Sequence, residues 1–439
     1  MKKAAVTTLG CKVNQYEGEA MAEAFAKKGY EVVSFAEKAD YYVIHTCAVT
    51  ASAERKSRRM IRRAYRHNPE AFIIVTGCYP QADQEAVKKL LGVDLIMGTK
   101  GRHRIVEEAE KLDKKETTKI LVASVKESDA YQDLPNTTFK DRTRAFLKIQ
   151  EGCDRYCAYC VIPYVRGPIR SRKESEVLKE ALSLRDAGYR EIVLTGINLG
   201  LYGKDLDDKE GLIKVLHRLH GIEGIQRIRL SSIEPTEITT ALLDTMASLS
   251  KMAHHLHIPL QSGDDVILSR MKRLYRGEDI IRLAEDIRKR LPQIGLSTDV
   301  IVGFPGEKEH HFGNTCRVVC EAAFNRVHIF PFSPRPMTEA SKLAGRVDQA
   351  VKEERSRRLN AQAKEQALSF HRRLVGRNES VLAEPPAEKT NRQAGWTSAY
   401  VRAVWPEGEK DLKGQLVDIH IVDADEEKVY GRLKKISKL

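Results

Sequence analysis

The chain has 439 residues and carries 74 Lys and Arg against 61 Asp and Glu, a formal net charge of +13. No apolar run approaches the roughly 18 residues that a bilayer requires, and the apolar stretch before Gly10 is too short for a signal peptide. We therefore expect neither a membrane protein nor a secreted one, with about three domains of roughly 100–200 residues each. The excess of cations favours an anionic partner, because Lys and Arg neutralise phosphates.

Residues 1 to about 104 alternate strand and helix patterns, which predict an open α/β domain with a parallel sheet over residues 1–115. Short, β-branched runs that are typical of buried parallel strands lie at 4–9, 42–46 and 72–77. Cys11, Cys47 and Cys78 follow these runs. Because the carboxyl ends of parallel strands line one crevice, we expect the three thiols to converge there as metal ligands. Any one of them alone is more simply a buried structural cysteine.

The stretch after Cys47 is the most basic part of the chain. From Glu54 to Arg66, seven Lys and Arg stand against one carboxylate. Apolar residues recur there at helical spacing, which leaves the cations on the outer face of an amphipathic helix. Guanidinium groups match phosphate oxygens well. Four arginines are therefore predicted to bind RNA: Arg58, Arg59, Arg62 and Arg63. The alternative is an ordinary solvated helix face.

Residues 116–140 are polar, contain a Leu-Pro-Asn breaker and are predicted to be a linker. Six strand–helix cycles follow within residues 141–370 and predict a partial (β/α)6 barrel, with active residues at the carboxyl ends of its strands. The strands are expected at 145–149, 191–195, 227–231, 255–260, 296–301 and 326–330. A long amphipathic helix leads into residues 371–437, where short runs alternate with Gly and Pro and predict a small antiparallel β-barrel.

The most informative motif is C-x3-C-x2-C, formed by Cys153, Cys157 and Cys160. Three thiolates in one loop can hold three irons of a 4Fe–4S cluster and leave the fourth open, whereas a cluster for electron transfer alone usually has four cysteines. Structural zinc, the alternative, needs a fourth ligand, and the nearest later histidine, His217, is too far along the chain. The last two cysteines are interpreted as packing residues of a helix: Cys316 and Cys320.

This motif, preceded by a strand-like run at 146–149, resembles the signature of radical S-adenosylmethionine enzymes. In that superfamily the open iron binds the amino and carboxylate groups of S-adenosylmethionine, and an electron from the cluster releases a 5′-deoxyadenosyl radical. The run CAYCVIPYVRG at 157–167 is similar to the methylthiotransferases. The resemblance implies these cofactor-binding residues: Tyr159, Gly196, Asn198, Glu234, Gln261 and Ser262. A tight βα turn is the alternative for the glycine-rich stretch at 195–200.

The amino-terminal motifs TLGCKVNQYE (8–17) and TCAVT (46–50) are similar to the methylthiotransferase domain that holds an auxiliary 4Fe–4S cluster. The resemblance implies two clusters, the second bound by Cys11, Cys47 and Cys78. The carboxyl-terminal barrel is similar to the TRAM domain, an RNA-binding module. The first motif most resembles the branch that modifies N6-threonylcarbamoyladenosine (t6A) in tRNA. The branches that modify isopentenyl-adenosine in tRNA, or an aspartate of a ribosomal protein, are the alternatives.

The reaction that the resemblance implies replaces C–H by C–S–CH3 at C2 of the adenine. Because that hydrogen is not acidic, acid–base catalysis cannot remove it, whereas a radical can. One S-adenosylmethionine supplies the methyl group and another the radical, with an electron from a donor such as flavodoxin or ferredoxin and sulfur from an unidentified donor. We expect a cytoplasmic monomer that binds the anticodon arm of tRNA, since eight reduced cysteines suit the cytosol. A metal-stabilised RNA-binding protein is the non-enzymatic alternative.

Overall fold

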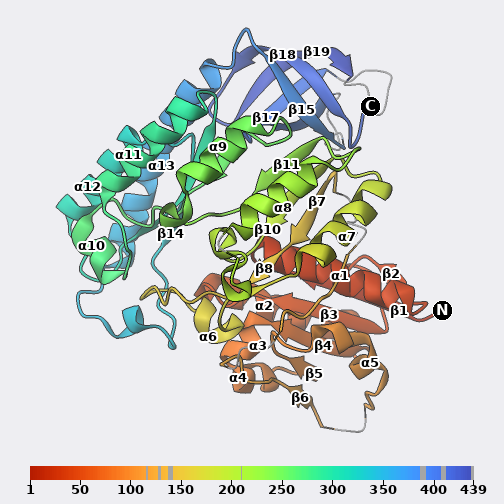
Figure 1. Ribbon diagram of the computed structural model, residues 1–439. Helices are drawn as coiled ribbons and strands as arrows, with labels where there is room; N and C mark the ends of the chain where they lie inside the picture. The colour runs from red at the N-terminus through yellow and green to blue at the C-terminus, as the bar shows by residue number, and fades with distance from the viewer. Residues whose placement is uncertain are drawn as a thin grey trace.

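The computed structural model describes residues 1–114, 117–126, 130–136, 142–208, 210–385, 392–406 and 412–436. They form an amino-terminal parallel sheet, a curved set of parallel strands in the middle and a closed carboxyl-terminal barrel (Figure 1). Within these ranges, no helix combines the length and the apolar character that crossing a membrane requires.

The amino-terminal part is a six-stranded parallel sheet with the order β2-β1-β3-β4-β5-β6. Its strands are β1 (Lys3–Thr8), β2 (Glu31–Val33), β3 (Tyr41–Thr46), β4 (Phe72–Gly77), β5 (Val93–Met97) and β6 (Lys119–Leu121). One face is covered by α1 (Lys12–Lys27) and α5 (Ile105–Glu110). The other is covered by α2 (Ala51–His67), α3 (Cys78–Ala82) and α4 (Gln84–Lys88). Helices on both faces explain why the central strands are apolar throughout.

The order of this sheet places a crevice at the predicted thiols. Strand β2 is added on one side of β1 and β3 on the other, so the winding direction switches between β1 and β3. Ligands of open α/β sheets bind at the carboxyl ends of the strands at such a switch point. Cys11 follows β1 and Cys47 follows β3. At the opposite edge, β6 extends the sheet into the segment 116–140 that was predicted as a linker, part of which lies outside the described residues.

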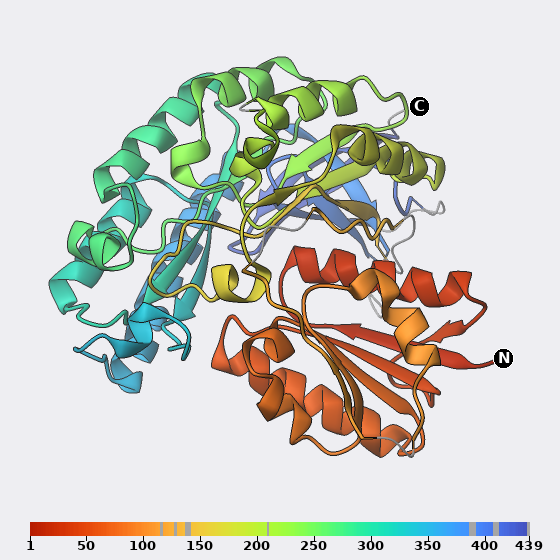
Figure 2. The ribbon, with the colours of Figure 1, turned by 60° about the horizontal axis from the view of Figure 1, so that its bottom comes forward.

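Six parallel strands form the middle part in the order β7-β10-β11-β12-β13-β14. They are β7 (Arg144–Lys148), β10 (Glu191–Thr195), β11 (Arg227–Leu230), β12 (His255–His257), β13 (Gly295–Val302) and β14 (Arg326–Pro331). Between β11 and β12, regular pairing is replaced by two isolated β-bridges. One joins Ile228 and Met252, and the other joins Ser232 and His257. Figure 2 shows the result as an arc with its helices outside. The predicted partial barrel of six β/α units is confirmed.

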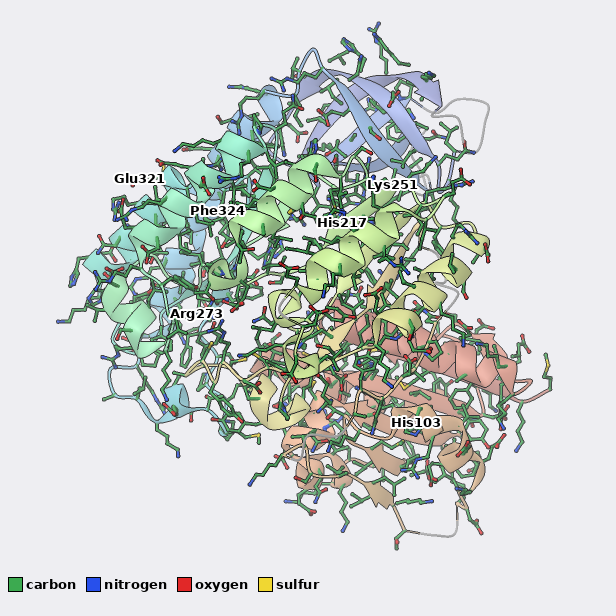
Figure 3. All side chains as sticks on the ribbon, in the orientation of Figure 1. His103, His217, Lys251, Arg273, Glu321 and Phe324 are labelled. Atoms are coloured by element: carbon green, nitrogen blue, oxygen red, sulfur yellow. The ribbon has the colours of Figure 1, made fainter. Side chains whose placement is uncertain are left out.

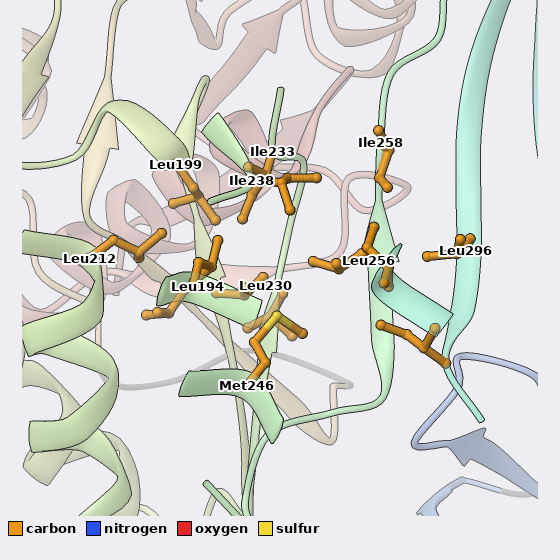
Figure 4. Packing of buried hydrophobic residues seen from close by; sticks show 14 of the residues in the cluster. Leu194, Leu199, Leu212, Leu230, Ile233, Ile238, Met246, Leu256, Ile258 and Leu296 are labelled. Carbon is orange, nitrogen blue, oxygen red and sulfur yellow. The ribbon is translucent and has the colours of Figure 1, made fainter. Parts of the chain in front are cut away.

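The helices outside the arc are α7 (Glu174–Asp186), α8 (Gly211–His220), α9 (Thr240–Ser248), α11 (Gly277–Arg290) and α12 (Glu309–Glu321). Alternate strand residues such as Leu194, Leu230 and Leu256 pack toward them in an extended apolar core (Figure 4). Cys316 of α12 is partly buried against this core, which fits its predicted packing role. Cys320 is exposed, so the packing interpretation of Cys320 is wrong.

The remaining elements before α13 are short. They are β8 (Gln150–Glu151), β9 (Arg170–Ser171), α6 (Ile162–Arg166) and α10 (Asp265–Arg270). Single 3-10 turns lie at η1 (Arg102–Arg104), η2 (Leu199–Leu201), η3 (Lys204–Leu206), η4 (Pro235–Glu237) and η5 (Glu339–Lys342).

Helix α13 (Gln349–Arg372), the predicted connector, leads into a closed five-stranded barrel. Its strands are β15 (Asn378–Glu384), β16 (Arg392–Thr397), β17 (Arg402–Pro406), β18 (Leu416–Ala424) and β19 (Lys428–Ile436). The pairs are antiparallel except β17–β19, which is parallel. The predicted small barrel is confirmed, and one parallel pair takes part in its closure.

The turn between β16 and β17 fastens this barrel to the amino end of β11. Arg227 donates to the Trp396 carbonyl at 3.1 Å, and Arg229 donates to the carbonyls of Thr397 at 3.1 Å and Ser398 at 2.9 Å. The carboxyl ends of the middle strands are thereby left to the amino-terminal domain and the cysteine loop.

Candidate active site

The loop with Cys153, Cys157 and Cys160 follows β7 at the carboxyl ends of the middle strands. Its two stems are joined by the antiparallel pair β8–β9, and the Cys153 N–H donates to the Gly167 carbonyl at 3.0 Å. Gly152 has φ +75°, and a Cβ there would collide with the opposite stem, so glycine is needed to close the loop. Three thiols are thus presented by one short, closed segment.

Backbone hydrogen bonds hold the middle of this loop between two distant segments. The Ala158 N–H donates to the Met271 carbonyl at 3.0 Å, and the Ala340 N–H donates to the Ala158 carbonyl at 2.8 Å. Tyr159, a predicted cofactor residue, packs against the small apolar cluster of Ala158, Met271 and Phe304. This packing covers one side of the thiol loop, while Cys153 and Cys160 stay partly exposed.

Burial makes two thiols of the loop weaker acids. Burial raises the pKa of Cys153 to about 11, and burial together with repulsion from Cys157 also raises the pKa of Cys160. Thiols that resist ionisation become thiolates when a metal coordinates them. Arg273, labelled in Figure 3, donates to the Cys157 sulfur at 3.3 Å. In the part of the chain that the structure describes, no group of three His, Cys, Asp or Glu is arranged to hold a single metal ion.

Glu234, a predicted cofactor residue, follows β11 and is paired with Arg273. The guanidinium donates to both carboxylate oxygens, and it also donates to the Tyr275 hydroxyl at 2.8 Å. The Glu234 carboxylate therefore lies one side chain away from Cys157, with its charge balanced by Arg273.

Gly196 and Asn198 lie in the turn after β10. Gln150 Oε1 accepts from the backbone N–H groups of Ile197 and Asn198 at 2.9 Å each, and a Cβ at Gly196 would lie 2.9 Å from the same oxygen. Gly196 thus fits the tight-turn alternative. The Asn198 side chain differs, because both its amide atoms are buried and have no hydrogen-bond partner among the described residues. Since buried polar groups are almost always paired, this amide indicates a ligand site.

Gln261 and Ser262 follow β12. Gln261 has φ +63°, and its backbone pairs with β13 through the Asp299 carbonyl at 2.8 Å. The Ser262 hydroxyl is buried, lies 3.2 Å from the Thr315 hydroxyl and accepts from the Asp264 N–H at 3.2 Å. These bonds direct Ser262 toward α10 and α12, and its cofactor contact stays a prediction.

The second set of thiols lies at the carboxyl ends of the neighbouring strands β1, β3 and β4. Burial raises the pKa of Cys47 to about 12, and Cys78 and Cys11 add to that rise, so the three thiols sense one another electrostatically. Cys11 is exposed, whereas Cys47 and Cys78 are buried. A Cβ at Gly10 would lie 2.9 Å from the Cys47 sulfur, so glycine leaves room beside that thiol. The set has the donors of a three-cysteine cluster with one accessible side.

Sequence reasoning missed a buried group of charged and polar side chains between the two thiol sets. We call it the interface network: Asn14, Glu17, Arg102, Lys148, Glu151, Arg166 and Arg170. Glu17 of α1 accepts from Arg102 at 2.8 Å, Lys148 at 2.7 Å and Arg166 at 2.9 Å. Burial alone would raise the pKa of Glu17, but these three cations hold it well below its usual range. One signal exists in the sequence, because Asn14 and Glu17 occupy inward positions of α1 that are normally apolar.

The inner face of the arc carries polar side chains around Asp299. Asp299 of β13 stands 3.2 Å from the His257 ring and 3.3 Å from the His328 ring. His257 in turn lies 3.0 Å from the Ser297 hydroxyl. The side chains come from alternate positions of strands whose other positions are apolar, so a period of two distinguishes them. These side chains offer hydrogen-bonding groups to a polar ligand on the inner face of the arc.

The predicted RNA-binding arginines of α2 differ in how accessible they are. Arg59 and Arg62 are exposed. Arg58 donates to the Tyr79 hydroxyl at 3.2 Å, and Arg63 donates to the His67 ring at 3.2 Å. Contact with an anion is therefore easiest at Arg59 and Arg62.

Two family models match the chain: Uncharacterized protein family UPF0004 over residues 3–98 and Radical SAM superfamily over residues 147–319. Among solved structures, the radical S-adenosylmethionine methyltransferase TsrM of Kitasatospora setae, with cobalamin and a [4Fe-4S] cluster bound, superimposes with a TM-score of 0.57. The identity is 15%, with 78% of this chain and 77% of that chain covered, so the likeness shows the fold alone. Fold and family model together define a radical S-adenosylmethionine enzyme.

Relatives that match over most of their own length identify the type of reaction more closely. Threonylcarbamoyladenosine tRNA methylthiotransferase MtaB of Bacillus subtilis is 40% identical over 97% of this chain and 94% of its own length. MtaB of Thermotoga maritima is 39% identical, with 88% and 87% covered. A tRNA-2-methylthio-N(6)-dimethylallyladenosine synthase of Moorella thermoacetica is 35% identical, with 95% of both chains covered.

The chain belongs to the radical S-adenosylmethionine methylthiotransferase family. It is an enzyme that transfers methylthio groups, and its cofactors are S-adenosylmethionine and a 4Fe–4S iron–sulfur cluster. The non-enzymatic alternative is therefore wrong.

Proposed function

We propose that this enzyme adds a methylthio group to C2 of t6A beside the tRNA anticodon, using two molecules of S-adenosylmethionine and two 4Fe–4S clusters. One observation carries the choice of substrate. The relative with 40% identity over 97% of the chain is named for threonylcarbamoyladenosine, whereas the relative named for dimethylallyladenosine from Moorella thermoacetica reaches 35%.

In this proposal Cys153, Cys157 and Cys160 hold one cluster, and the amino-terminal set Cys11, Cys47 and Cys78 holds the other. The first cluster with S-adenosylmethionine supplies a radical able to remove an unreactive hydrogen from the base. The residues of the chain bind and orient the reactants. The unpaired amide of Asn198 is the contact to S-adenosylmethionine that the structure supports best. Tyr159, through its apolar packing, covers one side of the thiol loop.

The basic face of α2 and the carboxyl-terminal barrel support a proposal for how the enzyme binds tRNA. Arg59 and Arg62 of α2, with Arg58 and Arg63 beside them, bind the anticodon arm from one side, and the carboxyl-terminal barrel, as a TRAM module, binds it from the other. The polar side chains around Asp299 receive the modified base. An electron donor such as flavodoxin or ferredoxin is required, and we propose that the enzyme works as a cytoplasmic monomer.

Nucleoside mass analysis of tRNA tests this function. Cells that lack the gene are compared with cells that also carry the wild-type gene or the Cys153→Ala/Cys157→Ala/Cys160→Ala variant. We expect the methylthio form of t6A to disappear, t6A to accumulate and only the wild-type gene to reverse both changes. Loss of the methylthio form of isopentenyl-adenosine with an unaltered t6A pool would instead assign the enzyme to the dimethylallyladenosine branch.

A further inference from the structure

Arg166 connects the two thiol sets. It is the last residue of α6, the short helix that follows Cys160, yet this helix packs on the amino-terminal domain (Figure 2). Val161 and Val165 belong to the apolar core of that domain, and the Thr99 hydroxyl donates to the Val165 carbonyl at 2.6 Å. The segment that begins in the Cys153–Cys160 loop therefore ends within the amino-terminal site.

The guanidinium of Arg166 lies beside the amino-terminal thiols. The Asn14 Oδ1 that accepts from Arg166 also accepts from the Cys11 thiol at 3.7 Å. Cys78 packs in the same apolar cluster as Val161 and Val165, which precede Arg166. The two Nη groups of Arg166 are used, since Nη1 donates to Glu17 at 3.1 Å and Nη2 donates to Glu17 at 2.9 Å and to Asn14 at 2.6 Å. The Nε–H is buried without a hydrogen-bond partner among the described residues. An orphaned donor in this place indicates an acceptor that binds at the amino-terminal thiols.

The charge of the interface network points to the same acceptor. Its cations are Arg102, Lys148, Arg166 and Arg170, and its carboxylates are Glu17 and Glu151. The exposed fraction of each of these side chains is 7% or less. Four buried cations against two carboxylates leave an excess of positive charge, which is unfavourable unless an anion compensates it. A 4Fe–4S cluster held by three thiolates carries net negative charge and supplies that compensation.

We propose that Arg166 is a positioning residue for the second cluster: its Nε–H donates to the sulfur at Cys78, and its charge raises the reduction potential of that cluster. Net charge and hydrogen bonds to sulfur are two of the means by which a protein sets such a potential. Hydrogen-bonding partners behind the ligands also help to retain the metal. The inference rests on the second cluster of the proposed function.

The test uses the full chain with Cys153, Cys157 and Cys160 replaced by Ala, so that only the second cluster is reconstituted. In this background, Arg166→Lys keeps the charge but removes the Nε–H. Arg166→Gln removes both, and Glu17 keeps Arg102 and Lys148 as partners. Arg170→Gln is the matched control, because Arg170 belongs to the same network but pairs with Glu151. Redox titration followed by electron paramagnetic resonance gives the potential, and transfer to a chelator gives iron retention.

We expect a more negative potential in both Arg166 variants, with the larger shift in Arg166→Gln, and iron loss about tenfold faster than in the parent. Arg170→Gln should change both quantities less than either Arg166 variant does. Circular dichroism checks the fold, and Arg166→Lys carries the test if Arg166→Gln does not fold. An unshifted potential in the Arg166 variants, or an equal shift in Arg170→Gln, overturns the inference. A parent that binds no iron would contradict the proposed second cluster, whereas about four irons with an unshifted potential contradict only the role of Arg166.

Discussion

At the scale of single residues, the two thiol sets are built by different means. Cys153, Cys157 and Cys160 belong to one closed loop, so their proximity follows from local geometry. The amino-terminal thiols come from three neighbouring strand ends and depend on the whole sheet. Because the two sets come from different parts of the fold, replacing the cysteines of one set should leave the other set in place.

Replacing Cys153, Cys157 and Cys160 with Ala should lower the iron of the anaerobically reconstituted enzyme from about eight atoms to about four and abolish cleavage of S-adenosylmethionine. Iron analysis and assay of 5′-deoxyadenosine measure the two effects. Formation of 5′-deoxyadenosine by this variant would disprove the assignment of the loop.

The complementary variant replaces Cys11, Cys47 and Cys78 with Ala. It should also retain about four irons and still cleave S-adenosylmethionine, because the loop is intact, but it should no longer insert sulfur into RNA. Methylthio product from this variant would refute the second cluster.

Asn198→Ala should weaken the binding of S-adenosylmethionine by about tenfold or more, because a hydrogen bond to a charged ligand contributes roughly 1.5–3 kcal/mol. Equilibrium dialysis with the reconstituted enzyme measures the affinity. Asn360→Ala, at an exposed position of α13, is the control and should have no effect. Equal affinities for both variants would show that the buried amide of Asn198 faces no ligand.

At the scale of elements, α2 combines a packed stripe with a basic face. Ile61 and Ala64 are fully buried against the sheet, and the Thr50 hydroxyl caps the helix by accepting from the Ala53 N–H at 3.1 Å. Removal of exposed cations from this helix should therefore leave the fold intact and report on binding alone.

Arg59→Ser/Arg62→Ser should weaken tRNA binding and flatten its salt dependence by up to about one unit of slope per lost phosphate contact. A salt titration of tRNA affinity measures this. The control Arg282→Ser/Lys289→Ser removes two exposed charges from α11 on the outside of the arc. If both variants change the salt dependence of tRNA affinity equally, the effect reflects net charge alone. The basic face of α2 is then an ordinary solvated helix face.

At the scale of the whole molecule, the carboxyl-terminal barrel is held by a few buried contacts. Glu191 of β10 orients Arg227 at 3.2 Å and Arg229 at 2.8 Å, and these arginines donate to carbonyls of Trp396 in β16 and of Ser398 in the turn after it. Glu191 thus orients two of the side chains that hold the proposed RNA-binding module against the arc.

The pair Glu191→Gln/Arg229→Met should loosen that turn while keeping an acceptor for Arg227. The loss of charge-assisted hydrogen bonds of roughly 1.5–3 kcal/mol each should raise amide exchange at 396–402 by at least about tenfold. Hydrogen–deuterium exchange read by mass spectrometry measures it. Arg402→Met, which removes an ion pair to Glu384 inside the barrel, is the control. Unchanged exchange in the pair would mean that other contacts attach the barrel.

Local patterns determined much of this protein. The strand expected at 191–195 is β10 (Glu191–Thr195), and the other five middle strands start within one residue of their predicted starts. The thiol loop was equally predictable, since C-x3-C-x2-C brings its donors together within one loop. Periodicity and short spacing are properties of neighbouring residues, which is why they can be read without knowing the fold.

Tertiary structure alone decided the rest. Arg166 donates to Asn14, and Glu17 accepts from Lys148, although these partners are far apart in sequence. A buried charge is stable only with its partners in place, so a lone Glu or Arg in a pattern does not reveal whether it is buried. The position of β2 beside β1, which creates the switch point at Cys11 and Cys47, likewise depends on sheet order. The sequence by itself determined which chemistry the chain carries, and the packing of its domains decided which residues surround that chemistry.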